Sequence, residues 1–152
     1  MTVATRQVPL AKCLQSPMVF LSGPRQAGKT TTARHIFSSY NGIYLNWDLV
    51  EDRAKILSPP QNLLSSLNLQ VASIQNPLII FDEIHKYPHW KNYLKGFYDY
   101  TYWNGKIAIL VTGSARLDIY KKGSDSLMGR YFPYRIHPLS VREVTIQPPN
   151  TN

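Results

Sequence analysis

The residues best suited to chemistry form one glycine-rich run, Gly23-Pro24-Arg25-Gln26-Ala27-Gly28-Lys29-Thr30, with Thr31 directly after it. The spacing is G-x-x-x-x-G-K-[ST], and the run lies between an apolar segment and a helical pattern, as a phosphate-binding loop requires. Backbone N–H groups of such a loop surround a phosphate, and the helix adds the positive end of its dipole. We expect residues 23–31 to bind a nucleotide, with Lys29 reaching the β- and γ-phosphates and Thr30 ligating Mg²⁺.

Two carboxylates, Asp82 and Glu83, follow the apolar residues 78–81. Ligands of parallel sheets bind beyond the carboxyl ends of the strands, where this pair and the glycine-rich loop would meet. Asp82 is expected to share the Mg²⁺ with Thr30, through a water molecule, and Glu83 to polarise the attacking water as a general base. The alternative is a pair of solvated acids at a strand end. Beside a phosphate-binding loop, the pair favours hydrolysis over simple binding.

Two further positions are candidates for catalysis. Residues 107–111 run into Thr112-Gly113-Ser114, and a hydroxyl there can contact the γ-phosphate or the attacking water, with Ser114 preferred to Thr112. The alternative is a serine or threonine that closes a turn or caps a helix. Arg130 can neutralise charge on a transferring phosphoryl group, most often in a neighbouring subunit. Its alternative is an ordinary surface arginine.

Short apolar runs alternate with helical patterns along the chain, which predicts parallel βαβ units and an α/β fold. Strands are expected over residues 18–22, 42–47, 78–81, 106–112 and 131–136. Helices are expected over residues 29–39, 49–57, 62–73 and 90–103, with short helical or turn pieces at 115–120 and 126–129. Prolines 59 and 60 should end the second helix.

The composition favours one globular domain, since 152 residues are an ordinary domain length and 43% of them are hydrophobic. The single cysteine, Cys13, excludes an internal disulfide framework and a four-cysteine zinc site. The longest apolar runs fall far short of the ~20 residues of a membrane span, and the N-terminal residues lack the pattern of a signal peptide. The sequence thus predicts a soluble, cytoplasmic protein without a membrane contact.

The phrases GPRQAGKTT, LNWD, LIIFDEIHKYPHW, ILVTGSA and MGRYFPYRIHPLSVREV occur in this order. Together they resemble the AAA+-type ATPase domain of a large bacterial and archaeal group related to archaeal and STAND-like NTPases. The resemblance covers residues 8–144 and implies a three-layer α-β-α sandwich, with a five-stranded parallel sheet in the order 5-1-4-3-2.

Carried over by position, the resemblance assigns Lys29 and Thr30 to Walker A and Asp82 and Glu83 to Walker B. It assigns Ser114 to sensor 1, and Arg130 falls where the superfamily usually keeps its arginine finger. Residues 1–146 would then be the ATP-binding domain. Members usually continue into a C-terminal region, so residues 147–152 are expected to be a tail or the start of a linker to it.

The second half of the chain is basic, with ten basic and four acidic side chains in residues 84–152. Eight of the seventeen residues from Tyr87 to Trp103 are aromatic, interleaved with Lys91 and Lys95. Such a surface suits single-stranded nucleic acid or a protein partner. The alternative is a helix whose stripe of Trp90, Leu94 and Phe97 faces the core.

The leading hypothesis is a Mg²⁺-dependent ATPase that couples ATP turnover to a conformational change. Its expected assembly is a homo-oligomer in which Arg130 acts in trans. The second is a slow, nucleotide-gated binding module for protein or DNA. A P-loop kinase is a third option, but the acidic pair favours water as the acceptor. Residues 82–85 also match the D-E-x-H motif of one class of helicases. A helicase needs two nucleotide-binding lobes, and this chain has room for one. ATP is preferred to GTP because the guanine-specifying N-K-x-D motif is absent from the sequence.

Overall fold

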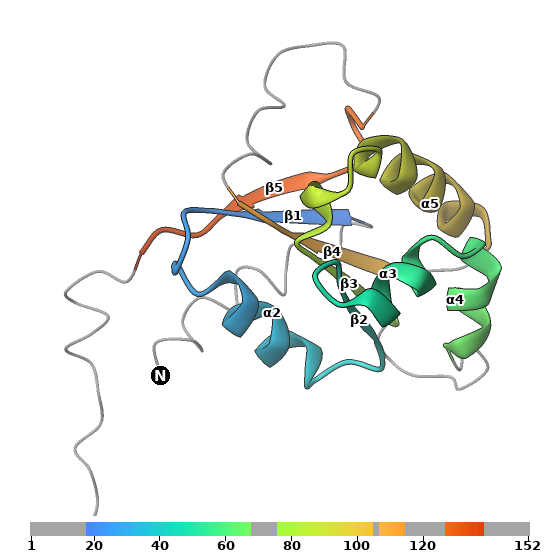
Figure 1. Ribbon diagram of the computed structural model, residues 1–152, viewed down its shortest axis with the longest axis horizontal. Helices are drawn as coiled ribbons and strands as arrows, with labels where there is room; N and C mark the ends of the chain where they lie inside the picture. The colour runs from blue at the N-terminus through green and yellow to red at the C-terminus, as the bar shows by residue number, and fades with distance from the viewer. Residues whose placement is uncertain (1–17, 68–75, 105–106, 115–126, 139–152) are drawn as a thin grey trace, which may run out of the picture.

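The computed structural model describes residues 18–67, 76–104, 107–114 and 127–138 (Figure 1). Its centre is one sheet whose strands all run parallel, in the order β2-β3-β4-β1-β5. The strands are β1 (Met18–Ser22), β2 (Gly42–Asn46), β3 (Leu78–Asp82), β4 (Ala108–Thr112) and β5 (Phe132–Arg135). The predicted α/β fold and the sheet order 5-1-4-3-2 are therefore confirmed, and each predicted strand is present within two residues of its expected bounds.

Helices occupy both faces of this sheet. They are α2 (Lys29–Phe37), α3 (Val50–Ile56), α4 (Pro60–Ser66), the short 3-10 helix η1 (Ile84–Lys86) and α5 (Trp90–Asn104). Helix α4 begins at Pro60, earlier than predicted, because proline's fixed φ and missing N–H suit the first helical position. Helix η1 was not predicted, since one turn carries no periodic signal. Residues 68–73 of the helix predicted over 62–73 and the piece over 115–120 lie outside the described residues.

The apolar strands have a core on each side. Along β1, Met18 and Phe20 belong to a cluster shared with α3, α4 and α5, whereas Val19 and Leu21 belong to a cluster shared with α2. Successive side chains of a strand point to opposite faces, so a strand covered on both sides is apolar at every position. This explains the unbroken apolar runs in the sequence and gives the predicted three layers, visible in Figure 1.

The aromatic helix α5 packs on the sheet through the predicted stripe, since Trp90, Leu94 and Phe97 are all buried. The core-facing interpretation of these three residues is confirmed. At the end of the helix, the side chains of Tyr102 and Trp103 are 62% and 82% exposed. None of the helices in the described ranges is long and apolar enough to cross a membrane.

Candidate functional site

The glycine-rich loop connects β1 to α2 and depends on backbone conformations that favour glycine. Gly23 has φ +154° and Gly28 has φ +85°. A β-carbon on Gly23 would lie 2.3 Å from the carbonyl oxygen of Ile136, the residue after β5. The backbone N–H of Ile136 donates to the Ser22 carbonyl at 2.8 Å, so the end of β5 holds the start of the loop. A glycine at position 23 is thus required by a close approach of the backbone.

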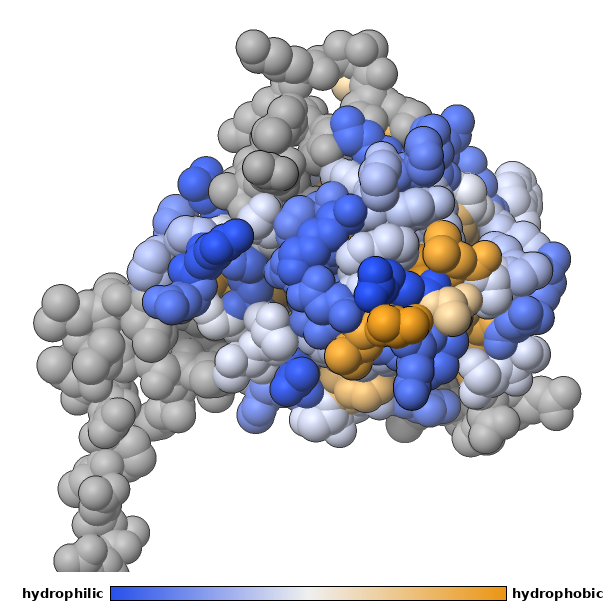
Figure 2. Space-filling model, viewed as in Figure 1, coloured by the Kyte–Doolittle hydropathy of each residue, from blue (hydrophilic) through white to orange (hydrophobic). Residues whose placement is uncertain are grey.

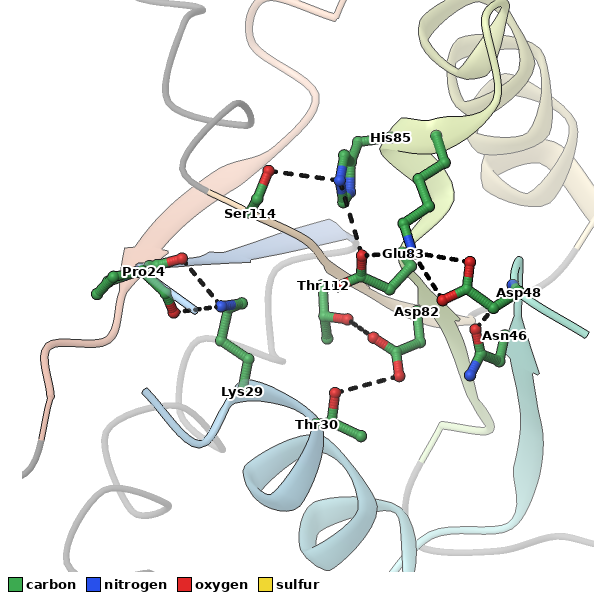
Figure 3. Close-up of polar contacts among 12 residues, drawn as sticks. Pro24, Lys29, Thr30, Asn46, Asp48, Asp82, Glu83, His85, Thr112 and Ser114 are labelled. Carbon is green, nitrogen blue, oxygen red and sulfur yellow. Dashed lines mark hydrogen bonds and ion pairs between the residues drawn. The ribbon is translucent and has the colours of Figure 1, made fainter. Parts of the chain in front are cut away.

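Lys29 begins α2 and is only 8% exposed. Its ammonium donates hydrogen bonds to the carbonyl oxygens of Gly23, at 2.9 Å, and Pro24, at 2.6 Å, and so folds back over the loop (Figure 3). Burial lowers the pKa of Lys29, and the nearby charges of Glu83 and Asp82 partly oppose that shift. The predicted phosphate-binding lysine therefore lies among the loop carbonyls and within the electrostatic reach of both predicted acids.

Asp82 ends β3 and is 2% exposed, yet its carboxylate accepts three hydrogen bonds. Thr30 donates to Oδ2 at 3.3 Å, Thr112 donates to Oδ1, and the Tyr44 hydroxyl donates to Oδ2 at 2.5 Å. A buried carboxylate needs such donors in place of water. Thr30 and Asp82, which the sequence analysis assigns to one Mg²⁺, are thus in direct side-chain contact.

Tyr44 was not predicted from the sequence, because its partner lies 38 positions further along the chain. Burial raises the pKa of the Tyr44 phenol, and its hydrogen bond to Asp82 raises it further. The phenol is therefore neutral at physiological pH and remains a hydrogen-bond donor. The only sequence feature that pointed to Tyr44 was its hydroxyl, which lies on the strand next to the one that ends in Asp82.

Glu83 follows β3 in the left-handed region, with φ +60°, and this turn leads into η1. Its Oε2 lies 3.3 Å from Lys86 Nζ and 3.7 Å from His85 Nε2. Lys86 also contacts both carboxylate oxygens of Asp48, at 2.7 and 2.8 Å. The hydrogen bond to Asp48 is the main cause that raises the pKa of Lys86. The predicted general base therefore lies beside two cationic or ionisable side chains that the sequence did not assign (Figure 3).

The two hydroxyls at the end of β4 lie in different surroundings. Thr112 is fully buried and donates to Asp82, whereas Ser114 Oγ lies 3.4 Å from His85 Nε2. Ser114, the preferred candidate, faces a cavity, whereas Thr112 donates its hydrogen bond to the Asp82 carboxylate inside the protein.

A cavity of about 1070 Å³ brings these elements together. Its lining residues come from the glycine-rich loop, the start of α2, η1 and the end of β4: Pro24, Arg25, Gln26, Gly28, Lys29, Thr30, Thr31, Glu83, His85, Lys86 and Ser114. This volume lies just above the range of roughly 300–1,000 Å³ that is usual for small-molecule sites. The cavity lies beyond the carboxyl ends of β1, β3 and β4, which is where ligands of parallel sheets bind.

Arg130 does not line this cavity. It precedes the edge strand β5, and its Nε donates to Asp99 Oδ1 of α5 at 2.9 Å. Its side chain is 30% exposed. The structure thus separates Arg130 from the other predicted catalytic residues of its own chain.

An apolar surface lies next to the acidic partner of Lys86. Helix α3 begins two residues after Asp48, and three large apolar residues at its ends are each more than half exposed: Leu49, Val50 and Leu57. Figure 2 shows apolar surface over this helix, surrounded by hydrophilic surface.

Comparison with known protein families matches residues 15–145 to the family described as AAA domain. The chain is 32% identical over 130 residues to uncharacterized proteins of Mycobacterium tuberculosis and Mycobacterium bovis, covering 86% of this chain and 27% of theirs. The chain therefore spans about a quarter of the length of these relatives. It is also 35% identical over 79 residues to a Lon protease of Lachnoclostridium phytofermentans, covering 47% of this chain and 10% of that protein.

Among solved structures, the chain is similar to a Walker-type ATPase of Pyrococcus abyssi, with a TM-score of 0.63. The likeness covers 91% of this chain and 54% of that one, at 18% sequence identity. At this identity the comparison supports the fold, which is that of a P-loop NTPase.

Proposed function

The chain belongs to the AAA domain family of P-loop NTPases, and from this we propose that it binds and hydrolyses ATP with Mg²⁺ and couples turnover to a conformational change. One observation carries the proposal. Lys29, the Thr30–Asp82 pair and Glu83 converge beyond the carboxyl ends of neighbouring strands, and three of the four residues line one cavity. This arrangement would supply a phosphate-binding cation, oxygen ligands for a metal and a carboxylate base.

The residues present fit a magnesium ion beside the phosphates. The Thr30 hydroxyl and the Asp82 carboxylate lie 3.3 Å apart, and both are the hard oxygen ligands that Mg²⁺ takes. Thr30 would hold the ion directly and Asp82 through a water molecule. The ion, when bound, neutralises charge on the β- and γ-phosphate oxygens.

The chain's own groups would then carry out the reaction. Lys29 would exchange the carbonyls of Gly23 and Pro24 for phosphate oxygens as the nucleotide enters. Glu83 would take a proton from water, whose oxygen bonds to the γ-phosphorus while the bond from that phosphorus to the bridging oxygen breaks. The products are ADP and inorganic phosphate. Ser114, which lines the same cavity, would orient the γ-phosphate or the water.

A second function, a slow nucleotide-gated binding module, is favoured by the surroundings of Glu83. Its carboxylate is held in an ion pair with the Lys86 ammonium at 3.3 Å, which competes with a water molecule for the same oxygen. A steady ATPase rate raised by DNA or a protein partner would support the ATPase that couples turnover to a conformational change. A nucleotide-bound state that persists for many minutes would support the module.

We propose ATP as the ligand and the cytoplasm as the location. The basic second half of the chain would be the surface for a DNA or protein partner. A homo-oligomer in which Arg130 reaches a neighbouring site is consistent with the position of this residue on the edge of the sheet, away from its own cavity.

The test is ATP binding by wild type and by Lys29→Ala, with Lys55→Ala as the control, because Lys55 is an exposed lysine of α3. Calorimetry with Mg·ATP, paired with phosphate release, should show binding lost in Lys29→Ala and retained in Lys55→Ala. An unchanged ATP affinity in Lys29→Ala would contradict the proposed site.

A further inference from the structure

Tyr44 reaches the magnesium-site carboxylate from a neighbouring strand. It lies on β2, paired in register with Ile80 of β3, two positions before Asp82. Ile80 and Asp82 share one face of β3, because side chains alternate along a strand. From the position beside Ile80, the Tyr44 hydroxyl extends along the sheet and donates to Asp82 Oδ2 at 2.5 Å.

The ring of Tyr44 is held by the helix that begins with the phosphate-binding residues. Phe37 of α2 packs its ring edge-on against Tyr44, with centroids 5.8 Å apart. The guanidinium carbon of Arg34, also on α2, lies 5.7 Å from the centroid of the Tyr44 ring, within cation–π range. Tyr44 is therefore fixed between α2, which carries Thr30, and the carboxylate of Asp82.

The three hydrogen bonds to the Asp82 carboxylate would respond differently to the binding of a cation. Thr112 donates to Oδ1, while Thr30 and Tyr44 both donate to Oδ2. Of the two hydrogen bonds to Oδ2, the one from Thr30 is the longer, at 3.3 Å. The Thr30 hydroxyl is also the group that would turn toward the metal. When Thr30 does so, Tyr44 is the donor that still holds Oδ2.

We propose that Tyr44 is a positioning residue for the divalent cation: its hydroxyl holds Oδ2 of Asp82 in place when Thr30 turns to the metal. The inference rests on the proposed ATPase function and deepens it. It differs from a purely structural role, in which Tyr44 only packs α2 against the sheet. A packing role would change folding stability and nucleotide affinity whether or not Mg²⁺ is present.

The experiment compares Tyr44→Phe with Tyr40→Phe, because both tyrosines pack against the same apolar cluster and both changes remove one hydroxyl. The affinity for a fluorescent ATP analogue is titrated against Mg²⁺ and repeated in EDTA. In Tyr44→Phe, we expect the Mg²⁺ concentration that gives half of the increase in analogue affinity to be ~10–100-fold higher than in wild type. Loss of a group that orients a metal ligand typically weakens metal binding by this factor. Its affinity in EDTA and all values of Tyr40→Phe should match wild type.

A double-mutant cycle guards against a folding artefact. If Tyr44 acts through Asp82, then Tyr44→Phe should add nothing in an Asp82→Asn background. Thermal unfolding of each variant is recorded alongside. An unchanged Mg²⁺ requirement in Tyr44→Phe, an equal loss of affinity with and without Mg²⁺, or additivity with Asp82→Asn would overturn the inference. A wild-type chain that binds no nucleotide would instead contradict the proposed function.

Discussion

Gly23 and Ile136 lie in backbone contact, so close that a β-carbon at position 23 would stand 2.3 Å from the Ile136 carbonyl oxygen. The contact joins the first glycine of the phosphate-binding loop to the residue that follows the edge strand β5. The loop's conformation therefore depends on a strand more than one hundred residues later in the chain, as well as on its own glycines.

Gly23→Ala should lower the free energy of unfolding by about 2–4 kcal/mol, because backbone overpacking and a strained φ each cost on the order of 1–3 kcal/mol. The control is Gly96→Ala in α5, where an added β-carbon meets open space. That change should stabilise the helix by ~1 kcal/mol. Urea denaturation measures both, and equal stability of Gly23→Ala and wild type would show that the loop can shift away from β5.

Glu83→Gln should bind ATP normally and hydrolyse it ~10²–10⁴-fold more slowly, since the amide cannot accept a proton. Asp82→Asn should instead weaken the Mg²⁺ dependence of binding. Single-turnover phosphate release, with binding measured in parallel, separates the two effects. Normal turnover in Glu83→Gln would assign the base to another residue.

Thr112→Val and Ser114→Ala should have different consequences, although the residues are two positions apart. Thr112 is buried against Asp82, so losing its hydroxyl should cost on the order of 1–3 kcal/mol of stability. Ser114 lines the cavity, so its loss should leave stability unchanged and lower the hydrolysis rate by up to ~10²-fold. Chemical denaturation and steady-state ATPase assays test this pair, and a destabilised Ser114→Ala would point to a structural serine.

The ATPase rate per molecule of wild type should rise with protein concentration, as subunits associate. Arg130→Ala should abolish this rise and leave ATP affinity intact. Asp99→Ala is the matched control, since it breaks the same ion pair but keeps the arginine. Both changes should cost only ~0.2–1 kcal/mol of stability, because the pair is partly exposed.

Mixing Arg130→Ala with Glu83→Gln should restore some ATPase activity if one site combines an intact Glu83 with a neighbour's Arg130. Rates strictly proportional to protein amount in wild type, with Arg130→Ala behaving alike, would exclude a trans-acting arginine.

Features that depend on neighbouring residues in the chain were predictable from the sequence. The glycine-rich loop was predictable because its spacing and its position between an apolar run and a helix are local properties. The apolar run 18–22 was predictable as a strand because a strand buried on both faces leaves no polar position. The acidic pair was placed correctly for the same reason, since Asp82 ends such a run.

The side chains that complete the site depend instead on the three-dimensional fold. Tyr44 reaches Asp82, Lys86 reaches Asp48, and Arg130 is held by Asp99, across 38, 38 and 31 positions of the chain. No spacing rule predicts such contacts, because they follow from strand register, from the turn at Glu83 and from the packing of α5 beside the edge strand. Sequence periodicity reports which face of an element is buried, whereas the partner of a polar group depends on which elements the fold brings side by side.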